Sequence, residues 1–174
     1  MAFSPDAMQL VSGDIEGRLK IWDTKTGEQW NGWRVPDGID SLALSPDGRP
    51  IACAGRQDAE NETVSLWDAT TGEPLPTLRG QQDAINSLAF SPDGRVLASA
   101  SQNRSVRLWD ARSGDTLRSV RGDRGLLPGV NSRSDNSFCL NFSLLGCTNR
   151  CTPWSDTSLL PDGADTLELA IDRA

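Results

Sequence analysis

One repeat runs through residues 1–121 and limits what this chain can fold into. Three tryptophan–aspartate pairs begin at Trp22, Trp67 and Trp109, so they stand 45 and 42 residues apart. Two further markers keep the same phase: a Ser-Pro-Asp sequence that begins at Ser4, Ser45 and Ser91, and a Thr-Gly or Ser-Gly pair that begins at Thr26, Thr71 and Ser113. A fixed period of this length indicates a series of similar structural units that stack on one another.

The markers predict turns, and the residues between them predict strands. Ser-Pro-Asp-Gly is typical of a type I turn, and the glycine of Thr-Gly accepts the positive φ that closes a second hairpin. Four short runs of strand composition fill the last unit, at 85–91, 96–101, 105–110 and 116–121. Consecutive apolar residues, as in Leu88-Ala89-Phe90, are typical of sheets buried on both faces. The sequence therefore predicts an all-β chain of stacked four-stranded antiparallel sheets.

On these residues the chain resembles the WD-repeat β-propeller family. The resemblance covers residues 1–121 and implies a partial propeller of about three blades, at about 1–35, 36–80 and 81–121. It gives six residues a structural role, with the tryptophans in the core: Trp22, Trp67, Trp109, Asp23, Asp68 and Asp110. Residues 122–174 do not match the repeat, and we expect there an irregular tail that is either a degenerate half-blade or a loop or disordered segment.

The number of repeats is too small for a closed ring. Propellers close with about four to eight blades, and an open end would expose an apolar sheet face to water. We therefore expect this chain to be a fragment of a longer propeller. The alternatives are association with further blades, including self-association that completes the ring, and a cap supplied by the tail.

The sequence also departs from the family at one buried site. Family repeats often carry a Gly-His pair before the first strand, and its histidine joins a buried network with a hydroxyl, an aspartate and the tryptophan. The corresponding positions hold Val35-Pro36, Gly80-Gln81 and Gly122-Asp123, and the chain has no histidine. We therefore expect that the full network forms in none of the repeats and that the blades are looser than is usual.

Composition excludes several classes of function. The absence of histidine removes Ser-His and Cys-His nucleophilic pairs. There are 24 acidic and 17 basic residues, a net charge of -7, which argues against binding to nucleic acid or to an anionic membrane. Because no Gly-rich phosphate loop is present either, we expect no enzyme activity and no cofactor. No signal-peptide pattern occurs in residues 1–20, which predicts a cytoplasmic location.

Two clusters of potential metal ligands have simpler interpretations. Cys139, Cys147 and Cys151 lack the paired C-x-x-C spacing of a zinc site, so we expect ordinary free thiols and no metal. Asp58, Glu60 and Glu62 alternate in a loop that carries an insertion and lacks the glycine and the terminal glutamate of an EF-hand. This stretch is predicted to be a solvated acidic loop, with partner recognition as the alternative.

The family resemblance implies that partners bind on the rim formed by loops between repeats and between second and third strands. Trp30 and Trp33 either pack on the next blade or present an aromatic patch there. The predicted partner-binding residues are Trp33, Arg56, Asp58, Glu60, Glu62, Gln81, Asp83 and Arg104. The hypothesis is a non-enzymatic scaffold that binds other proteins. The alternatives are a regulatory or sensor segment of a larger signalling ATPase or kinase, and a non-functional truncated gene product.

Overall fold

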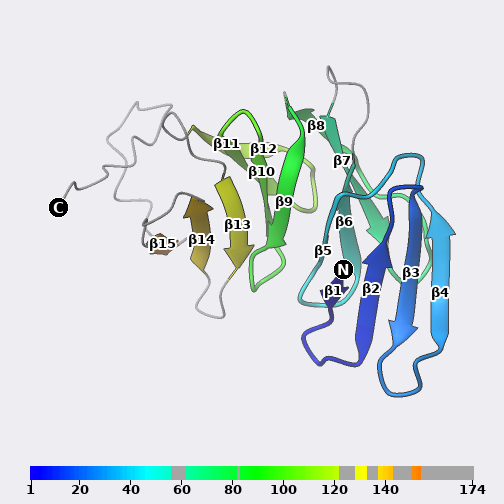
Figure 1. Ribbon diagram of the computed structural model, residues 1–174. Coiled ribbons are helices and arrows are strands. Elements are labelled where there is room, and N and C mark those ends of the chain that lie inside the picture. Colours follow the sequence, from blue (N-terminus) through cyan, green and yellow to red (C-terminus); the bar gives the residue numbers. More distant parts are fainter. Residues whose placement is uncertain (56–61, 82, 122–127, 133–136, 143–149, 154–174) are drawn as a thin grey trace.

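The computed structural model describes residues 1–55, 62–81, 83–121, 128–132, 137–142 and 150–153. The regular structure in these residues is β-strand, arranged as antiparallel sheets that are stacked in chain order (Figure 1). The first strands of successive sheets lie next to one another along the stack. None of the described residues belongs to a helix that is long and apolar enough to cross a membrane.

Three four-stranded sheets follow the repeat. The first contains β1 (Ala2–Phe3), β2 (Gln9–Gly13), β3 (Arg18–Asp23) and β4 (Gln29–Arg34). The second contains β5 (Ser41–Leu44), β6 (Pro50–Ala54), β7 (Glu62–Asp68) and β8 (Leu78–Gln81). The third contains β9 (Ile85–Phe90), β10 (Val96–Ser101), β11 (Ser105–Asp110) and β12 (Thr116–Arg121). In each sheet the strands are neighbours in chain order, which confirms the predicted four-stranded antiparallel units.

A further sheet lies in the segment that the repeat does not match. It contains β13 (Pro128–Ser132), β14 (Ser137–Phe142) and β15 (Arg150–Pro153). Val130, only 1% exposed, packs against the third sheet, and the Ser87 hydroxyl donates a hydrogen bond of 3.0 Å to its carbonyl oxygen. One face of the third sheet is therefore covered by this chain's own residues. Whether residues 122–174 form a separate unit stays a prediction.

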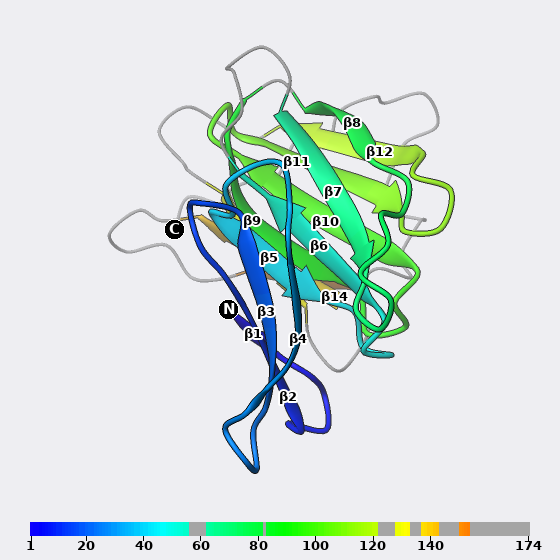
Figure 2. The ribbon, with the colours of Figure 1, turned by 90° about the vertical axis from the view of Figure 1, so that its right-hand side faces the viewer.

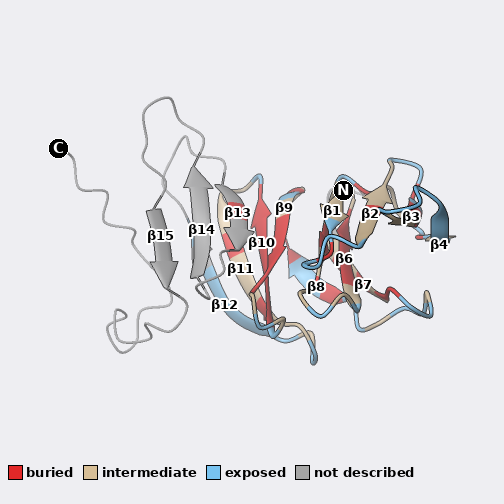
Figure 3. Cartoon of the chain, turned by 90° about the horizontal axis from the view of Figure 1, so that it is seen from below, coloured by how far each residue is buried: buried red, intermediate tan, exposed pale blue. Residues whose placement is uncertain are grey.

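The core lies between the sheets, where an aliphatic face meets a face that carries tryptophan. Val11, Leu19 and Ile21 of the first sheet pack against the second sheet at Ile51 and Trp67. The other face of the second sheet packs in the same way on the third, against a set that comprises Leu88, Phe90, Leu97 and Trp109. Figure 3 shows these buried strands between the layers. Trp109 is 1% exposed, whereas Trp22 and Trp67 are half-buried.

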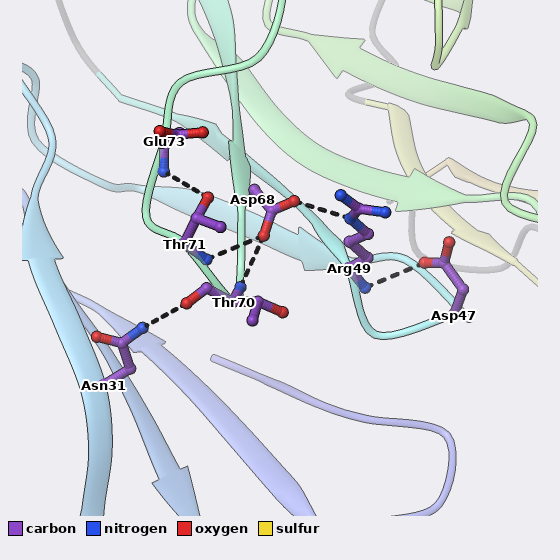
Figure 4. A network of polar contacts seen from close by, with 7 residues as sticks. All are labelled: Asn31, Asp47, Arg49, Asp68, Thr70, Thr71 and Glu73. Atoms are coloured by element: carbon purple, nitrogen blue, oxygen red, sulfur yellow. Dashed lines mark hydrogen bonds and ion pairs between the residues drawn. The ribbon is translucent and has the colours of Figure 1, made fainter.

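The aspartate of each Trp-Asp pair closes the turn between the third and fourth strands. The Asp68 carboxylate accepts hydrogen bonds from the backbone N–H groups of Thr70 and Thr71, at 2.9 and 3.0 Å, and from Nε of Arg49 at 2.8 Å (Figure 4). Asp23 and Asp110 accept the equivalent backbone bonds in their own turns. In the second sheet the turn is also tied to the first, because Nδ2 of Asn31 donates to the Thr70 carbonyl oxygen at 3.2 Å.

This arrangement predicts a loss of stability in acid. The Arg49 guanidinium, together with the two backbone N–H groups, lowers the pKa of Asp68 to about 2. Because this pKa is lower in the folded than in the unfolded chain, ionised Asp68 stabilises the fold above about pH 4, and the contribution is lost as the pH falls toward about 2. Urea unfolding followed by tryptophan fluorescence should show a midpoint that falls over this range, and less steeply in Asp68→Asn. An equally steep fall in Asp68→Asn, with exposed Glu28→Gln as the control, would contradict this role.

The Ser-Pro-Asp turns join the first and second strands and share one unusual backbone angle. The Ser4 hydroxyl donates to Asp6 at 2.6 Å, and the Ser91 hydroxyl donates to Asp93 at 2.5 Å. The residue after the aspartate has a positive φ in each turn: 55° at Ala7, 73° at Gly48 and 71° at Gly94. Only the first of these residues carries a Cβ, so only the first turn is strained.

We predict that Ala7→Gly stabilises the protein. Relief of the left-handed backbone is worth about 1–2 kcal/mol, and the greater freedom of glycine in the unfolded chain offsets about half of it. The free energy of unfolding in urea should therefore rise by about 0.5–1 kcal/mol. The matched variant Gly48→Ala should lower it, because nothing lies within 4 Å of a Cβ there and the backbone alone decides the outcome. A lower stability of Ala7→Gly would refute this account of the turn.

Candidate functional site

Several loops meet along one side of the stacked sheets and form a continuous edge, at the top of Figure 1. The Ile39 N–H donates to the Asp14 carbonyl oxygen at 2.9 Å, which joins the β4–β5 loop to the β2–β3 loop. The Asp40 N–H donates to the Ala54 carbonyl oxygen at 2.9 Å, which joins it to the end of β6. We call the described residues of this edge the rim: 14–18, 35–40, 55, 83–84 and 102–104.

Two glycines allow the rim loops to pack backbone against backbone. A Cβ on Gly38 would lie 2.5 Å from the Ile15 carbonyl oxygen, and a Cβ on Gly55 would overlap the Gly38 carbonyl oxygen. No larger residue fits at either position unless the loops move apart. The backbone of the rim is therefore fixed across the first and second sheets.

The third sheet continues the rim with the same kind of contact. The Gln102 N–H donates to the Ala84 carbonyl oxygen at 2.8 Å, and the Ser101 hydroxyl donates to the Asp83 carbonyl oxygen at 2.9 Å. Arg104 is half-buried and has a φ of 70°, which only a few residues other than glycine adopt. The turn between β10 and β11 contains Arg104, and it is joined to Asp83 through the hydrogen bond of Ser101.

The exposed part of the rim combines one apolar side chain with many charged ones. Ile15 is 80% exposed at the tip of the β2–β3 turn. Beside it, Arg18 forms ion pairs with Asp14, at 3.8 Å, and with Glu16. Both pairs are solvent-exposed, so they add little to stability. Burial raises the pKa of the Asp37 carboxyl, which lies in the adjoining loop.

The predicted site residues fall into three groups. Asp83 and Arg104 lie in the rim, as just described. Glu62 is the first residue of β7, and Arg56, Asp58 and Glu60 lie outside the described residues. Trp33 and Gln81 are placed elsewhere, and both predictions need correction.

Trp33 packs between the first two sheets. Its ring centroid lies 6.4 Å from that of Trp67, and a Cβ on Gly72 would lie 3.2 Å from Cε3 of Trp33. Trp30 is the exposed member of the pair, at 54%. Trp33 is paired with Leu19, whose side chain is buried between the first two sheets, and the pairing places Trp33 on that same face. Of the two expectations for Trp33, the structure therefore favours packing on the next sheet.

Gln81 is buried, with 3% exposed, and its amide is used inside the protein. Its Oε1 accepts from the Ser99 hydroxyl at 3.4 Å, and its Nε2 donates to the Ser105 hydroxyl at 3.3 Å. Ser99 in turn accepts from Nε1 of Trp109 at 2.9 Å, and the Ser105 hydroxyl donates to Asn103 at 2.5 Å. This placement rules out the predicted contact with a partner.

The same contacts correct the expectation that the full network forms in none of the repeats. A glutamine amide offers a donor and an acceptor, as a neutral histidine ring does, and so Gln81 connects the tryptophan to the turn residue in the third sheet. In the second sheet Cys53 occupies the hydroxyl position, and Trp67 donates instead to Ser65 at 3.0 Å. In the first sheet Trp22 donates to Ser12 at 2.8 Å.

Ile15 is the rim residue that the sequence analysis missed. An isoleucine between Asp14 and Glu16 is unusual in a polar turn, and this contrast was the available signal. Within the described part of the chain, no group of three or more cysteine, aspartate or glutamate side chains is arranged to hold a metal ion.

Comparisons with known proteins agree with this architecture. The family model "WD domain, G-beta repeat" matches residues 1–23 and 72–110. WD repeat and SOCS box-containing protein 1 of Danio rerio is 34% identical over 83 residues, which are 47% of this chain and 19% of that protein. Eukaryotic translation initiation factor 3 subunit I of Aspergillus fumigatus is 28% identical over 71 residues, which are 40% of this chain and 21% of that protein. The chain spans about a fifth of the length of these relatives.

Solved structures show the same fold. The structures of U3-55K and of the RRP9 WD40 repeats each superpose with a TM-score of 0.69 at 20% sequence identity, over 80% of this chain and 43% of theirs. The repeat period, the Trp-Asp turns, the four-stranded sheets and the matching family model agree with one another. Residues 1–23 and 72–110 therefore match the WD-repeat family, and the described sheets share the fold of these solved structures.

Proposed function

We propose that this chain is a non-enzymatic scaffold that binds a protein partner through the rim. The observation that carries the proposal is the set of backbone hydrogen bonds between rim loops, from Ile39 to Asp14 and from Gln102 to Ala84. Loops that are already ordered lose little conformational entropy on binding, so the entropic cost of binding a partner at this surface is small. WD-repeat propellers generally serve as non-enzymatic scaffolds, which supports this role.

The composition of the rim indicates the kind of partner. Its charged residues are mostly acidic, since Arg18 and Arg104 stand among Asp14, Glu16, Asp37, Asp40 and Asp83. An acidic surface favours a partner with a basic one and speeds their association at low salt. The exposed Ile15 side chain supplies an apolar centre, and energetically important contacts gather at such centres. We therefore propose a protein partner that presents lysine or arginine side chains around an apolar pocket.

Two rim variants test this proposal without disturbing the fold. Ile15→Ser removes an exposed side chain, and Arg104→Gly removes a side chain at a positive φ that glycine accepts more easily. The immobilised chain should retain a protein from soluble extract of its source cells, and calorimetry should then show a loss of about tenfold or more in affinity for Ile15→Ser. Arg104→Gly should instead strengthen binding at low salt, because it removes a positive charge that repels the lysine or arginine side chains of the partner.

The matched control is Lys25→Ala, in the exposed turn between β3 and β4, on the side of the stack opposite to the rim. It should bind as the unaltered chain does, and the affinity of the unaltered chain and of every variant should fall as salt is raised. A partner that binds Ile15→Ser and Arg104→Gly with unchanged affinity would place the interaction elsewhere.

A second candidate is self-association through the first sheet. Phe3, Leu10 and Trp22 are paired across β1, β2 and β3, and Phe90, Leu97 and Trp109 form the same row in the third sheet. The row in the third sheet is at most 3% exposed because the second sheet covers it, whereas Phe3 is 60% exposed. Viewed from this end, β1–β4 lie in front of the other sheets (Figure 2). A second copy of the chain would bury this apolar row.

We predict that the chain forms a dimer that Phe3→Ser disrupts. Replacing an exposed phenylalanine with serine leaves the packed core intact but removes apolar area from the contact. Size-exclusion chromatography with light scattering should show a dimer for the unaltered chain and a monomer for Phe3→Ser. Leu117→Ser, at an exposed position of β12, is the control and should remain a dimer. A monomer for the unaltered chain at every concentration tested would refute this second candidate.

The cytoplasmic location stays a prediction, as do the alternatives of a segment of a signalling enzyme and of a truncated gene product.

A further inference from the structure

The register of the last sheet places two cysteines opposite each other. In the antiparallel pair of β14 and β15, Cys139 is the partner of Cys151. Directly opposed residues of such a pair have Cα atoms about 4.5 or about 5.5 Å apart, depending on the hydrogen-bonding position. Disulfides join Cα atoms that are roughly 4.4 to 6.8 Å apart. Either position therefore suits a bond between the two sulfurs, and directly opposed residues share one face of a sheet.

The described contacts of β13 show which face this is. Val130 packs against the third sheet and is paired with Leu140, while the next residue, Asn131, is paired with Cys139. Because successive residues alternate between faces, Cys139 and Cys151 lie on the face opposite to that of Val130. No described strand lies on that face (Figure 1).

We propose that Cys139 and Cys151 are a redox-responsive pair, which forms a disulfide that ties β15 to β14. Among the described strands, β15 is hydrogen-bonded only to β14, so this one bond would secure the outermost strand of the sheet. Cys53 takes no part in it. That thiol is 2% exposed in the core, and burial raises its pKa to about 12, so it stays protonated and unreactive.

The chemistry requires an oxidant, for which a small-molecule disulfide such as oxidised glutathione is sufficient. One cysteine thiolate attacks a glutathione sulfur and releases one glutathione thiolate. The second cysteine thiolate then attacks the protein sulfur of this mixed disulfide and releases the other glutathione. The two cysteines lose two electrons and two protons in total, and oxidised glutathione becomes two reduced glutathione molecules. An excess of reduced glutathione reverses both steps.

Peptide mapping of the full chain tests the proposal. The folded chain is incubated with oxidised glutathione, its remaining thiols are alkylated after denaturation, and trypsin separates residues 134–150 from residues 151–173. We expect these two peptides to be joined, and to separate after treatment with a reductant. The joined species should persist in Cys147→Ser and fall at least tenfold in Cys139→Ser and in Cys151→Ser. Tryptophan fluorescence of each variant checks that the fold is kept.

Three results would overturn the proposal. The joined species in Cys139→Ser at unchanged yield would show that Cys147 is the partner of Cys151. Similar yields of all three pairings among Cys139, Cys147 and Cys151 would show that the β14–β15 register does not direct the reaction. Cysteines that carry glutathione but never form a bond with each other would show that the pair is not within reach.

Discussion

The packing of unlike sheet faces is the interaction on which this structure depends. The first three sheets meet at two interfaces, and each of these joins an aliphatic face, such as Val11, Leu19 and Ile21, to a face that contains a tryptophan of the next sheet. A sheet inside the stack packs against a neighbour on each side, so its strands place apolar residues on both faces. This explains why β10 is buried at all of its positions. The arrangement gives the stack a direction. The first sheet presents an aromatic face outward, whereas the aliphatic face of the third sheet is covered by Val130 of β13.

Polar groups within these interfaces differ from one repeat to the next. In the third sheet a continuous chain of hydrogen bonds runs from Trp109 through Ser99 and Gln81 to the turn before β11. Cys53 interrupts the equivalent chain in the second sheet, because a thiol is a weak acceptor. A fully satisfied buried network rigidifies its surroundings, so local opening should be rarest around the third sheet. The rim loops near β10 and β11 are anchored to that part.

The local parts of the fold could be predicted from the sequence, because turn chemistry acts over a few residues. Ser-Pro-Asp-Gly and Thr-Gly located the hairpins, and the strands between them followed. Properties of a residue that depend on its contacts with a neighbouring sheet could not be predicted from the sequence. The choice between Trp30 and Trp33 depends on the pairing of Trp33 with buried Leu19, and the role of Gln81 depends on hydroxyls that belong to the next repeat. The sheet from β13 to β15 lacks all three sequence markers, and only the stretch from Val130 to Ser132 resembles an earlier strand.

The outer faces of the first sheet and of the β13–β15 sheet differ in composition. Along β14, the large apolar residues Phe138, Leu140 and Phe142 alternate with the smaller or polar residues Ser137, Cys139 and Asn141, and the register pairs Leu140 with buried Val130. Such alternation is typical of a sheet with one packed and one solvated face, and a polar outer face is what terminates a repeat array. The first sheet has no such face, since its row of exposed Phe3 and half-buried Leu10 and Trp22 is not covered by another described sheet. Association through an apolar sheet face therefore concerns the first sheet, whereas the end formed by β13–β15 can be secured within the chain.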